Sequence, residues 1–279
     1  MIPRASNLLS FCVSASLFLT TTTRADVDVA GPRAVRSGIK VAETIAETKR
    51  NYVHMIRDGM GELYTLDTDT GQFVAATKLR GAPSMGASMC FSLDETLLYV
   101  PLPSSQKVQI ISLATLSTID VINVGIPVAS LAAGFDGKLY AAAGDSLYQV
   151  DPKFGGSAPI GGTLYLYAPY IKSDPSGKRL FVMERGLSGG SEMLQEFTIV
   201  GGYRGVKPAT THFTVKENDK DFELDLENDS IYATAGGVYG INLWRVSTRS
   251  ESFWPYGEPY GTGVAHVPGS PYVYGSAGT

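Results

Sequence analysis

Short apolar segments with an aromatic centre recur along this chain at a nearly constant interval. Examples are Leu98-Tyr99-Val100, Leu139-Tyr140-Ala141 and Leu180-Phe181-Val182, whose aromatic residues are spaced by 41 positions. Each is too short for a helix and is followed by a second β-type segment, and no helical periodicity is sustained. The pattern therefore predicts an all-β fold. The six aligned anchors, separated by 46, 41, 41, 51 and 41 positions, are Val53, Tyr99, Tyr140, Phe181, Tyr232 and Val273.

Turn-forming residues lie immediately before these anchors. Their segments are 93–96, 135–138, 174–178 and 227–230, which are rich in Asp, Gly, Ser, Asn and Lys. Such residues favour tight connections between antiparallel strands. A period of about 41 residues with several short strands is typical of a β-propeller blade. We therefore predict a β-propeller of about six four-stranded blades, or an incomplete seven, over residues 51–279.

Three segments carry a family resemblance. Residues 136–140, 175–182 and 108–118 resemble the Tyr-Val-Thr-Asn (YVTN) type of propeller repeat, within a WD40-like and YVTN-like group. That group includes the heavy chain of quinoprotein amine dehydrogenases. The resemblance covers roughly residues 50–279 and implies a propeller fold, with seven blades in many relatives.

The first 25 residues have the order of a secretory signal peptide. One basic residue, Arg4, precedes a run of 12 mostly apolar residues (8–19), and a polar stretch then leads to Ala25. That run is too short to span a bilayer, and we predict cleavage after Ala25, export to the extracellular space or periplasm, and a mature chain without a membrane span. Residues 26–50 form an N-terminal segment in which 41–47 is expected to be either a helix or an outer strand that closes the ring.

Composition narrows the function classes. Lys and Arg number 23 against 27 Asp and Glu, a net charge of −4, and removal of the signal peptide (Arg4 and Arg24) makes it 21 − 27 = −6. Nucleic-acid and anionic-membrane binders need a basic face, so both classes are disfavoured. Of the two cysteines, Cys12 lies in the signal and Cys90 remains alone, which favours a buried, structural thiol.

Alternating polar residues just before two anchors suggest a site in the central channel. If 222–227 is an innermost strand, Glu223 and Asp225 share one of its faces, and His266 has a similar place before the last anchor. These three residues are weak candidates for catalytic groups. The same alignment places Tyr170, Lys172 and Met89 on innermost strands, and Tyr170 and Lys172 are candidate ligand contacts. The alternative, which we favour, is that they are structural polar groups bonded to neighbouring backbone.

Two further features bear on ligands and modification. Trp254 and Tyr256 lie in the aromatic-rich segment 244–260, where they either contact a ligand at one rim or pack between blades. Asn228-Asp229-Ser230 is a glycosylation sequon, and Asn228 is a candidate glycan site if the organism is eukaryotic.

Two motif matches are disfavoured. Gly186-Leu187-Ser188-Gly189-Gly190 has the letters of a nucleophile elbow, but the following segment has a strand pattern where the elbow needs a helix. Residues 67–71 resemble the start of a calcium loop but lack its later oxygen ligands, so an ordinary turn is the better interpretation. No resident metal or cofactor is identified.

The sequence thus favours a secreted propeller that acts as a binding or scaffolding module for a protein or carbohydrate at one mouth of its channel. A propeller enzyme of the lactonase or lyase type, with an acid–base site in the channel that acts with or without a metal ion, is an alternative. A subunit resembling an amine dehydrogenase heavy chain is a second alternative.

Overall fold

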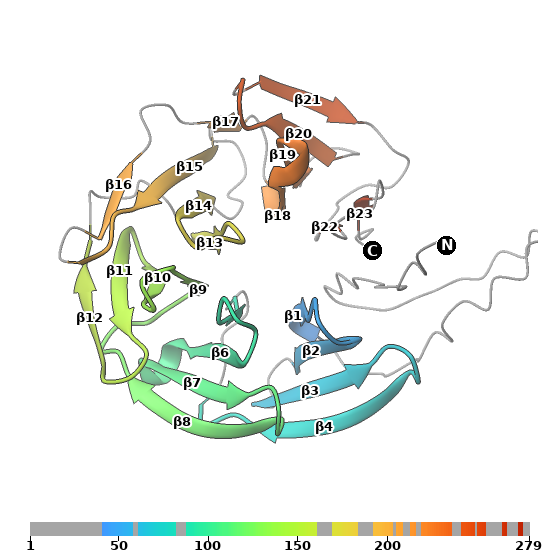
Figure 1. Ribbon diagram of the computed structural model, residues 1–279, viewed down its shortest axis with the longest axis vertical. Helices are drawn as coiled ribbons and strands as arrows, with labels where there is room; N and C mark the ends of the chain where they lie inside the picture. Colours follow the sequence, from blue (N-terminus) through green and yellow to red (C-terminus); the bar gives the residue numbers. More distant parts are fainter. Residues whose placement is uncertain are drawn as a thin grey trace, which may run out of the picture.

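The computed structural model describes residues 41–57, 61–81, 88–160, 169–183, 192–202, 205–208, 213–215, 219–235, 241–248, 250–254, 264–266 and 273–275. Its strands form six antiparallel sheets that stand as blades around a common axis (Figure 1). Five of the sheets have at least four strands, and the last has two among the described residues. The predicted all-β propeller of about six blades is confirmed.

The blades, numbered 1 to 6, follow one another in chain order. Blade 1 holds β1 (Val41–Ala46), β2 (Tyr52–Arg57), β3 (Glu62–Asp67) and β4 (Gln72–Lys78). Blade 2 holds β5 (Cys90–Phe91), β6 (Leu97–Leu102), the 3-10 turn η1 (Pro103–Ser105), β7 (Lys107–Ser112) and β8 (Ser117–Asn123). Blade 3 holds β9 (Ser130–Ala133), β10 (Leu139–Ala143), β11 (Ser146–Asp151) and β12 (Gly155–Pro159).

The remaining blades repeat this order. Blade 4 holds β13 (Tyr170–Ser173), β14 (Arg179–Met183), β15 (Glu192–Ile199) and β16 (Val206–Pro208), and β17 (Phe213–Val215) also pairs with β15. Blade 5 holds β18 (Asp219–Asp225), η3 (Leu226–Asn228), β19 (Ser230–Ala235), β20 (Ile241–Arg245) and β21 (Ser250–Trp254). Blade 6 is described by β22 (Val264–His266) and β23 (Val273–Gly275).

The anchors lie on the second strand of each blade, as their spacing predicts. The register refines the alignment at both ends of the chain. In blade 2 the aliphatic Leu98 pairs with Phe91, seven positions earlier across the turn, and Tyr99 follows it. Val53 has the same place in blade 1, opposite Ala46, and Val273 has it in blade 6, opposite His266. In these two blades the position equivalent to Tyr99 is therefore held by the next residue along the chain, His54 in blade 1 and Tyr274 in blade 6.

Residues 41–46 form the innermost strand of blade 1, which corrects both expectations for this segment. β1 pairs antiparallel with β2, with Ile45 opposite His54 and Ala46 opposite Val53. The Glu47 amide donates to the Tyr52 carbonyl at 2.9 Å and closes the hairpin. Because β1 joins the blade that follows it, it is neither a helix nor the outer strand of the last blade. Residues 1–40, with the predicted signal peptide, lie outside the described residues.

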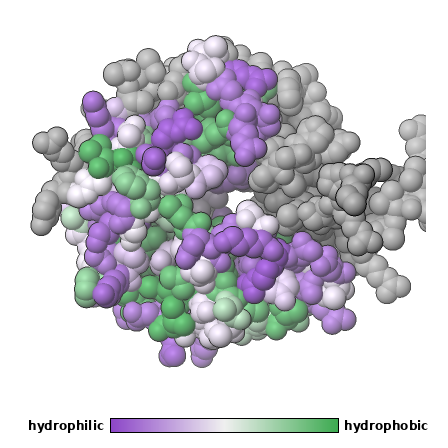
Figure 2. Space-filling view, viewed as in Figure 1, coloured by the Kyte–Doolittle hydropathy of each residue, from purple (hydrophilic) through white to green (hydrophobic). Residues whose placement is uncertain are grey.

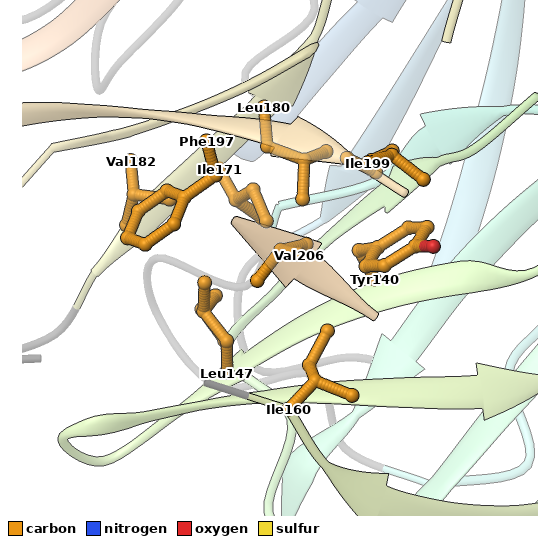
Figure 3. Close-up of a cluster of buried hydrophobic side chains, with 11 residues drawn as sticks. Tyr140, Leu147, Ile160, Ile171, Leu180, Val182, Phe197, Ile199 and Val206 are labelled. Carbon is orange, nitrogen blue, oxygen red and sulfur yellow. The ribbon is translucent and has the colours of Figure 1, made fainter. Parts of the chain in front are cut away.

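The hydrophobic core lies between blades. Figure 3 shows the layer between blades 3 and 4, where Tyr140 and Leu147 meet Ile171, Leu180 and Phe197. The aromatic anchor of one blade packs in the same cluster as the aliphatic residue that precedes the anchor of the next blade. This packing explains why an aliphatic and an aromatic residue recur next to each other in the sequence. The pairs are Tyr99 with Leu139, Tyr140 with Leu180, and Phe181 with Ile231.

Aspartates hold the turns between first and second strands. Asp174 is a clear case, because its Oδ1 accepts from the backbone amides of Lys178 and Arg179, both at 2.8 Å. An Asp carboxylate that bonds the backbone a few residues ahead stabilises such turns. In the equivalent turns of blades 2, 3 and 5, the carboxylates of Asp94, Asp136 and Asp225 also accept from backbone amides two or three residues ahead, although Asp94 and Asp136 lie later in their turns than Asp174.

The sole cysteine of the described part is half-buried. Cys90 lies on β5, packs against the core between blades 2 and 3, and is not disulfide-bonded. Burial raises the pKa of its thiol, which makes it a poor nucleophile.

None of the described segments forms a helix of the length and hydrophobicity that a membrane span requires.

Candidate functional site

Two predicted channel residues form an ion pair between neighbouring blades. Lys172 pairs in register with the anchor Phe181, and Glu223 pairs with the anchor Tyr232, so both have the same place on innermost strands. The Lys172 Nζ lies 2.8 Å from Glu223 Oε2, and their side chains are 22% and 28% exposed. The structure therefore brings together two of the predicted channel residues, one from blade 4 and one from blade 5.

Two rings flank the ammonium group. The Lys172 Nζ lies 5.5 Å from the ring centroids of Tyr170 and Phe222. Burial by itself would lower the pKa of Lys172, but the negative charges of Glu223 and Asp221 outweigh it and hold that pKa well above its ordinary value. Lys172 therefore stays protonated at neutral pH. A permanently charged lysine can hold the two blades together through its ion pair, but it cannot act as a general base.

A second contact crosses between blades 1 and 4. The Tyr170 hydroxyl on β13 donates to Glu43 Oε1 on β1 at 3.1 Å, although 127 residues separate them. Tyr170 is buried and meets Phe222 edge-on, with ring centroids 5.7 Å apart. Figure 2 shows a small opening near the centre of the ring, bordered in part by hydrophilic residues. Two polar contacts thus join different blades near the channel, Tyr170 with Glu43 and Lys172 with Glu223.

Asp225 bonds within its own turn. Its Oδ2 accepts from the Tyr232 hydroxyl at 3.3 Å, and both its oxygens accept from the Asn228 side-chain amide at 3.0 Å. Asp225 is 5% exposed and caps η3 through the Asn228 backbone amide. Burial is the main cause that raises the pKa of the Tyr232 phenol, with the Asp225 charge adding to it. These contacts fit a structural group in the β18–β19 turn.

The other predicted residues are only partly described. His266 ends β22 and pairs with Val273, the place that Leu224 holds in blade 5, so its register differs by one residue from that of Glu223. Trp254 ends β21 opposite Ile241, while Tyr256 and the Gly186–Gly190 motif lie outside the described residues.

Three other expectations fall on described residues. Asn228 is exposed at the end of η3, and its Nδ2, where a glycan would attach, donates to Asp225. Asp67 Oδ1 accepts from the amides of Asp69 and Thr70, so the calcium-like segment is a turn. Met89 is buried in the core between blades 1 and 2. Among the described residues, no three His, Cys, Asp or Glu side chains gather as metal ligands.

A buried network in blade 1 was not anticipated from the sequence. His54 Nε2 lies 2.7 Å from Glu47 Oε1, and its Nδ1 lies 2.9 Å from Thr65 Oγ1. Arg50 adds two bonds of 2.6 Å to the Glu47 carboxylate and one of 2.8 Å to the Leu113 carbonyl of blade 2. Burial would raise the pKa of Glu47, but the hydrogen bonds and charges of His54 and Arg50 lower it overall. One sequence feature could have indicated that His54 is buried: it directly follows an aliphatic residue, Val53, as Tyr99 follows Leu98.

An apolar patch lies on the face that carries the turns between first and second strands. Leu93, Phe135 and Val200 are 43%, 46% and 46% exposed. Gly177 lies against both Leu93 and Phe135, because a Cβ on it would lie 2.5 Å from Leu93 Cδ1 and 2.7 Å from the Phe135 amide nitrogen. A Cβ on Gly201, next to Val200, would lie 3.7 Å from Phe135 Cζ. We call this surface the turn-face patch. It spans blades 2, 3 and 4.

Comparisons with known proteins support the fold. No family model and no curated protein matches the sequence. Hydrazine synthase from Kuenenia stuttgartiensis matches 92% of this chain and 76% of its own at 16% identity, with a TM-score of 0.68. A chain of the mitotic checkpoint complex matches 96% of this chain and 82% of its own at 15% identity, with a TM-score of 0.61.

A third match is a propeller domain by itself. The β-propeller domain of Cps50 (Swd1) from Myceliophteria thermophila matches 85% of this chain and 93% of its own at 10% identity, with a TM-score of 0.58. At identities this low the similarity shows the fold and not the activity, and the matched structures include both an enzyme and a chain of a protein complex. At the level of fold, the chain is a β-propeller.

Proposed function

We propose that this protein is an exported binding module that holds a protein partner at one mouth of its channel, through the turn-face patch. The observation that carries the proposal is the exposure of Leu93, Phe135 and Val200 on adjoining blades. Contiguous exposed apolar side chains within a polar rim favour protein docking, because their burial releases water from both surfaces. Leu93 and Phe135 lie on turns between the two innermost strands, which is the part of each blade next to the channel.

The arrangement of the channel residues supports binding over acid–base chemistry. A lactonase or lyase mechanism needs a group that is free to take or give a proton near neutral pH. Lys172 is paired with Glu223 and its pKa is raised, while the Tyr170 hydroxyl is bonded to Glu43. Within the described part of the chain these groups join blades next to the channel, and the turn-face patch is an exposed surface that a partner can reach.

Site-specific photo-crosslinking tests this proposal. A photoreactive phenylalanine analogue at position 135 should give one defined protein adduct in the native host, and the same analogue at Phe73 should give none. Phe73 is a matched control because it is also exposed but lies on the outer strand β4. Phe135→Ser should abolish co-purification of that partner without lowering Tm, whereas Phe73→Ser should not affect it.

Two outcomes would contradict the proposal. Equal crosslinking from positions 135 and 73 would show that the patch is not a specific surface. Loss of the partner on Lys172→Met, with no effect of Phe135→Ser, would move the site into the channel. Export is tested separately, since N-terminal sequencing of secreted material should begin near Asp26 and not at Met1.

A further inference from the structure

A polar hollow lies on the outer part of blade 2, away from the turn-face patch. Its volume is about 430 Å³, and it is lined by two cations, one carboxylate, one hydroxyl and two aliphatic side chains. These residues are Arg80, Lys107, Asp120, Thr118, Ile119 and Val121. Pockets for small ligands are usually about 300–1,000 Å³, so the hollow can hold a molecule of monosaccharide size.

The floor of the hollow is fixed by a fully buried amide. Gln109, which is 0% exposed, accepts from the Arg80 backbone amide at 2.7 Å through its Oε1. Its Nε2 donates to the Lys78 carbonyl at 3.0 Å and to Thr118 Oγ1 at 2.6 Å. One side chain therefore joins the end of β4 to β8 and sets the positions of Arg80 and Thr118. The hollow is thus built on a rigid base.

The cationic groups of the hollow have no protein counterion within the described residues. Arg80 is exposed and Lys107 is half-buried, and neither the Arg80 guanidinium nor the Lys107 ammonium has an ion-pair or hydrogen-bond partner among these residues. Because Thr118 Oγ1 accepts from Gln109, its own proton is free to be donated elsewhere. The hollow therefore offers three donors to an acidic group. An Arg fork and a Lys ammonium together suit a carboxylate.

The remaining lining residues suit a hydroxylated ring. Asp120 offers a carboxylate that can accept from hydroxyl groups, and its Oδ1 also accepts from the Val121 amide at 2.7 Å. Ile119, which is 57% exposed, is the extra residue of a β-bulge, because Ile110 pairs with Asp120 and Ile111 pairs with Thr118. A bulge turns a side chain out of the regular pleat, and here it presents an aliphatic surface for the C–H face of a ring.

The bulge alone does not make the site. Blade 1 has the same irregularity in β4, where Thr65 pairs with Ala75 and Leu66 with Phe73, leaving Val74 as the extra residue. Blade 2 adds Arg80 and Lys107 to this scaffold. We propose that the hollow formed by Arg80, Lys107, Thr118 and Asp120 binds a sugar that carries a carboxylate, of the uronic acid type. This inference is independent of the protein-binding function proposed above.

NMR titration of the full-length isotope-labelled protein with glucuronate tests this inference. The amide signals of Lys107, Thr118 and Asp120 should shift and saturate with a Kd of the order of 1 mM, as expected for one charged group in an open site. Arg80→Gln and Lys107→Gln should each weaken binding about tenfold. The matched control is Lys153→Gln, since Lys153 is an exposed lysine on the β11–β12 turn of blade 3. It should leave the Kd unchanged.

Two smaller probes separate the parts of the ligand. Glucose has the hydroxyls without the carboxylate, and acetate has the carboxylate without the ring, so each should bind at least tenfold more weakly than glucuronate. Glucose binding as well as glucuronate, or acetate binding as well as glucuronate, overturns the assignment of a sugar acid. Absence of saturable shifts up to 50 mM glucuronate, or an unchanged Kd in Arg80→Gln, overturns the site.

Discussion

The ion pair between Lys172 and Glu223 is expected to stabilise the contact between blades 4 and 5. Lys172→Met keeps most of the side-chain length but leaves the Glu223 carboxylate, 28% exposed, without its cation. Breaking a buried pair costs about 3–5 kcal/mol, and an exposed pair contributes about 0.2–1 kcal/mol. Since both side chains are less than a third exposed, we expect a loss of about 1.5–3 kcal/mol in the free energy of unfolding.

A double-mutant cycle isolates the pair. Lys172→Met and Glu223→Gln should each destabilise in urea denaturation, and the double variant should lose about 1–2 kcal/mol less than the sum of the two. Lys178→Met is the matched control, because Lys178 is an exposed lysine on the next turn of the same blade. Additive effects, or an equal loss in the control, would refute the reasoning.

The pH dependence gives an independent check. The pKa of folded Lys172 lies well above its ordinary value, because the Glu223 and Asp221 charges outweigh burial. A raised folded-state pKa gives stability that is complete below the unfolded pKa, about 10.4 for lysine, and is lost as pH rises through the folded value. The stability difference between the wild type and Lys172→Met should therefore be constant from pH 6 to 9 and shrink only in strong alkali. A difference that disappears below pH 9 would contradict this.

Two further changes test the turns and the buried network of blade 1. Gly177→Ala should cost about 2–3 kcal/mol by urea denaturation, because φ is +66° and the new Cβ would overlap the Phe135 backbone, whereas Gly137→Ala, at φ +73° with nothing within 4 Å, should cost about 1 kcal/mol. Equal losses would contradict the close approach. Glu47→Gln should cost about 2–3 kcal/mol, because Glu47 is 2% exposed and bonds His54 and Arg50. Since the pKa of Glu47 is lowered in the fold, this difference in thermal stability should be present above about pH 4.3 and shrink as pH falls below it, and a difference that grows in acid would refute the assignment.

The repeating architecture was readable from the sequence because its signals are local. An aliphatic residue followed by an aromatic one, after a turn rich in Asp and Gly, specifies a strand and its hairpin within about ten residues. Tyr99, Tyr140, Phe181 and Tyr232 therefore fell on the predicted second strands. The polar character of the channel was also partly predictable, because Lys172 and Glu223 hold one register position in adjacent repeats.

Contacts between blades required the tertiary structure. The bond between Tyr170 and Glu43 joins residues 127 positions apart, and no local pattern marks Glu43, because ring geometry alone brings β1 opposite β13. The alignment of the first and last blades also depends on strand pairing. His54 and Tyr274, and not Val53 and Val273, are therefore the residues equivalent to Tyr99. The sequence by itself thus determined the blade and its repeat, through hydrogen bonding and burial within each hairpin. Only the tertiary structure decided which side chains of different blades meet, because that depends on how successive sheets pack around the axis.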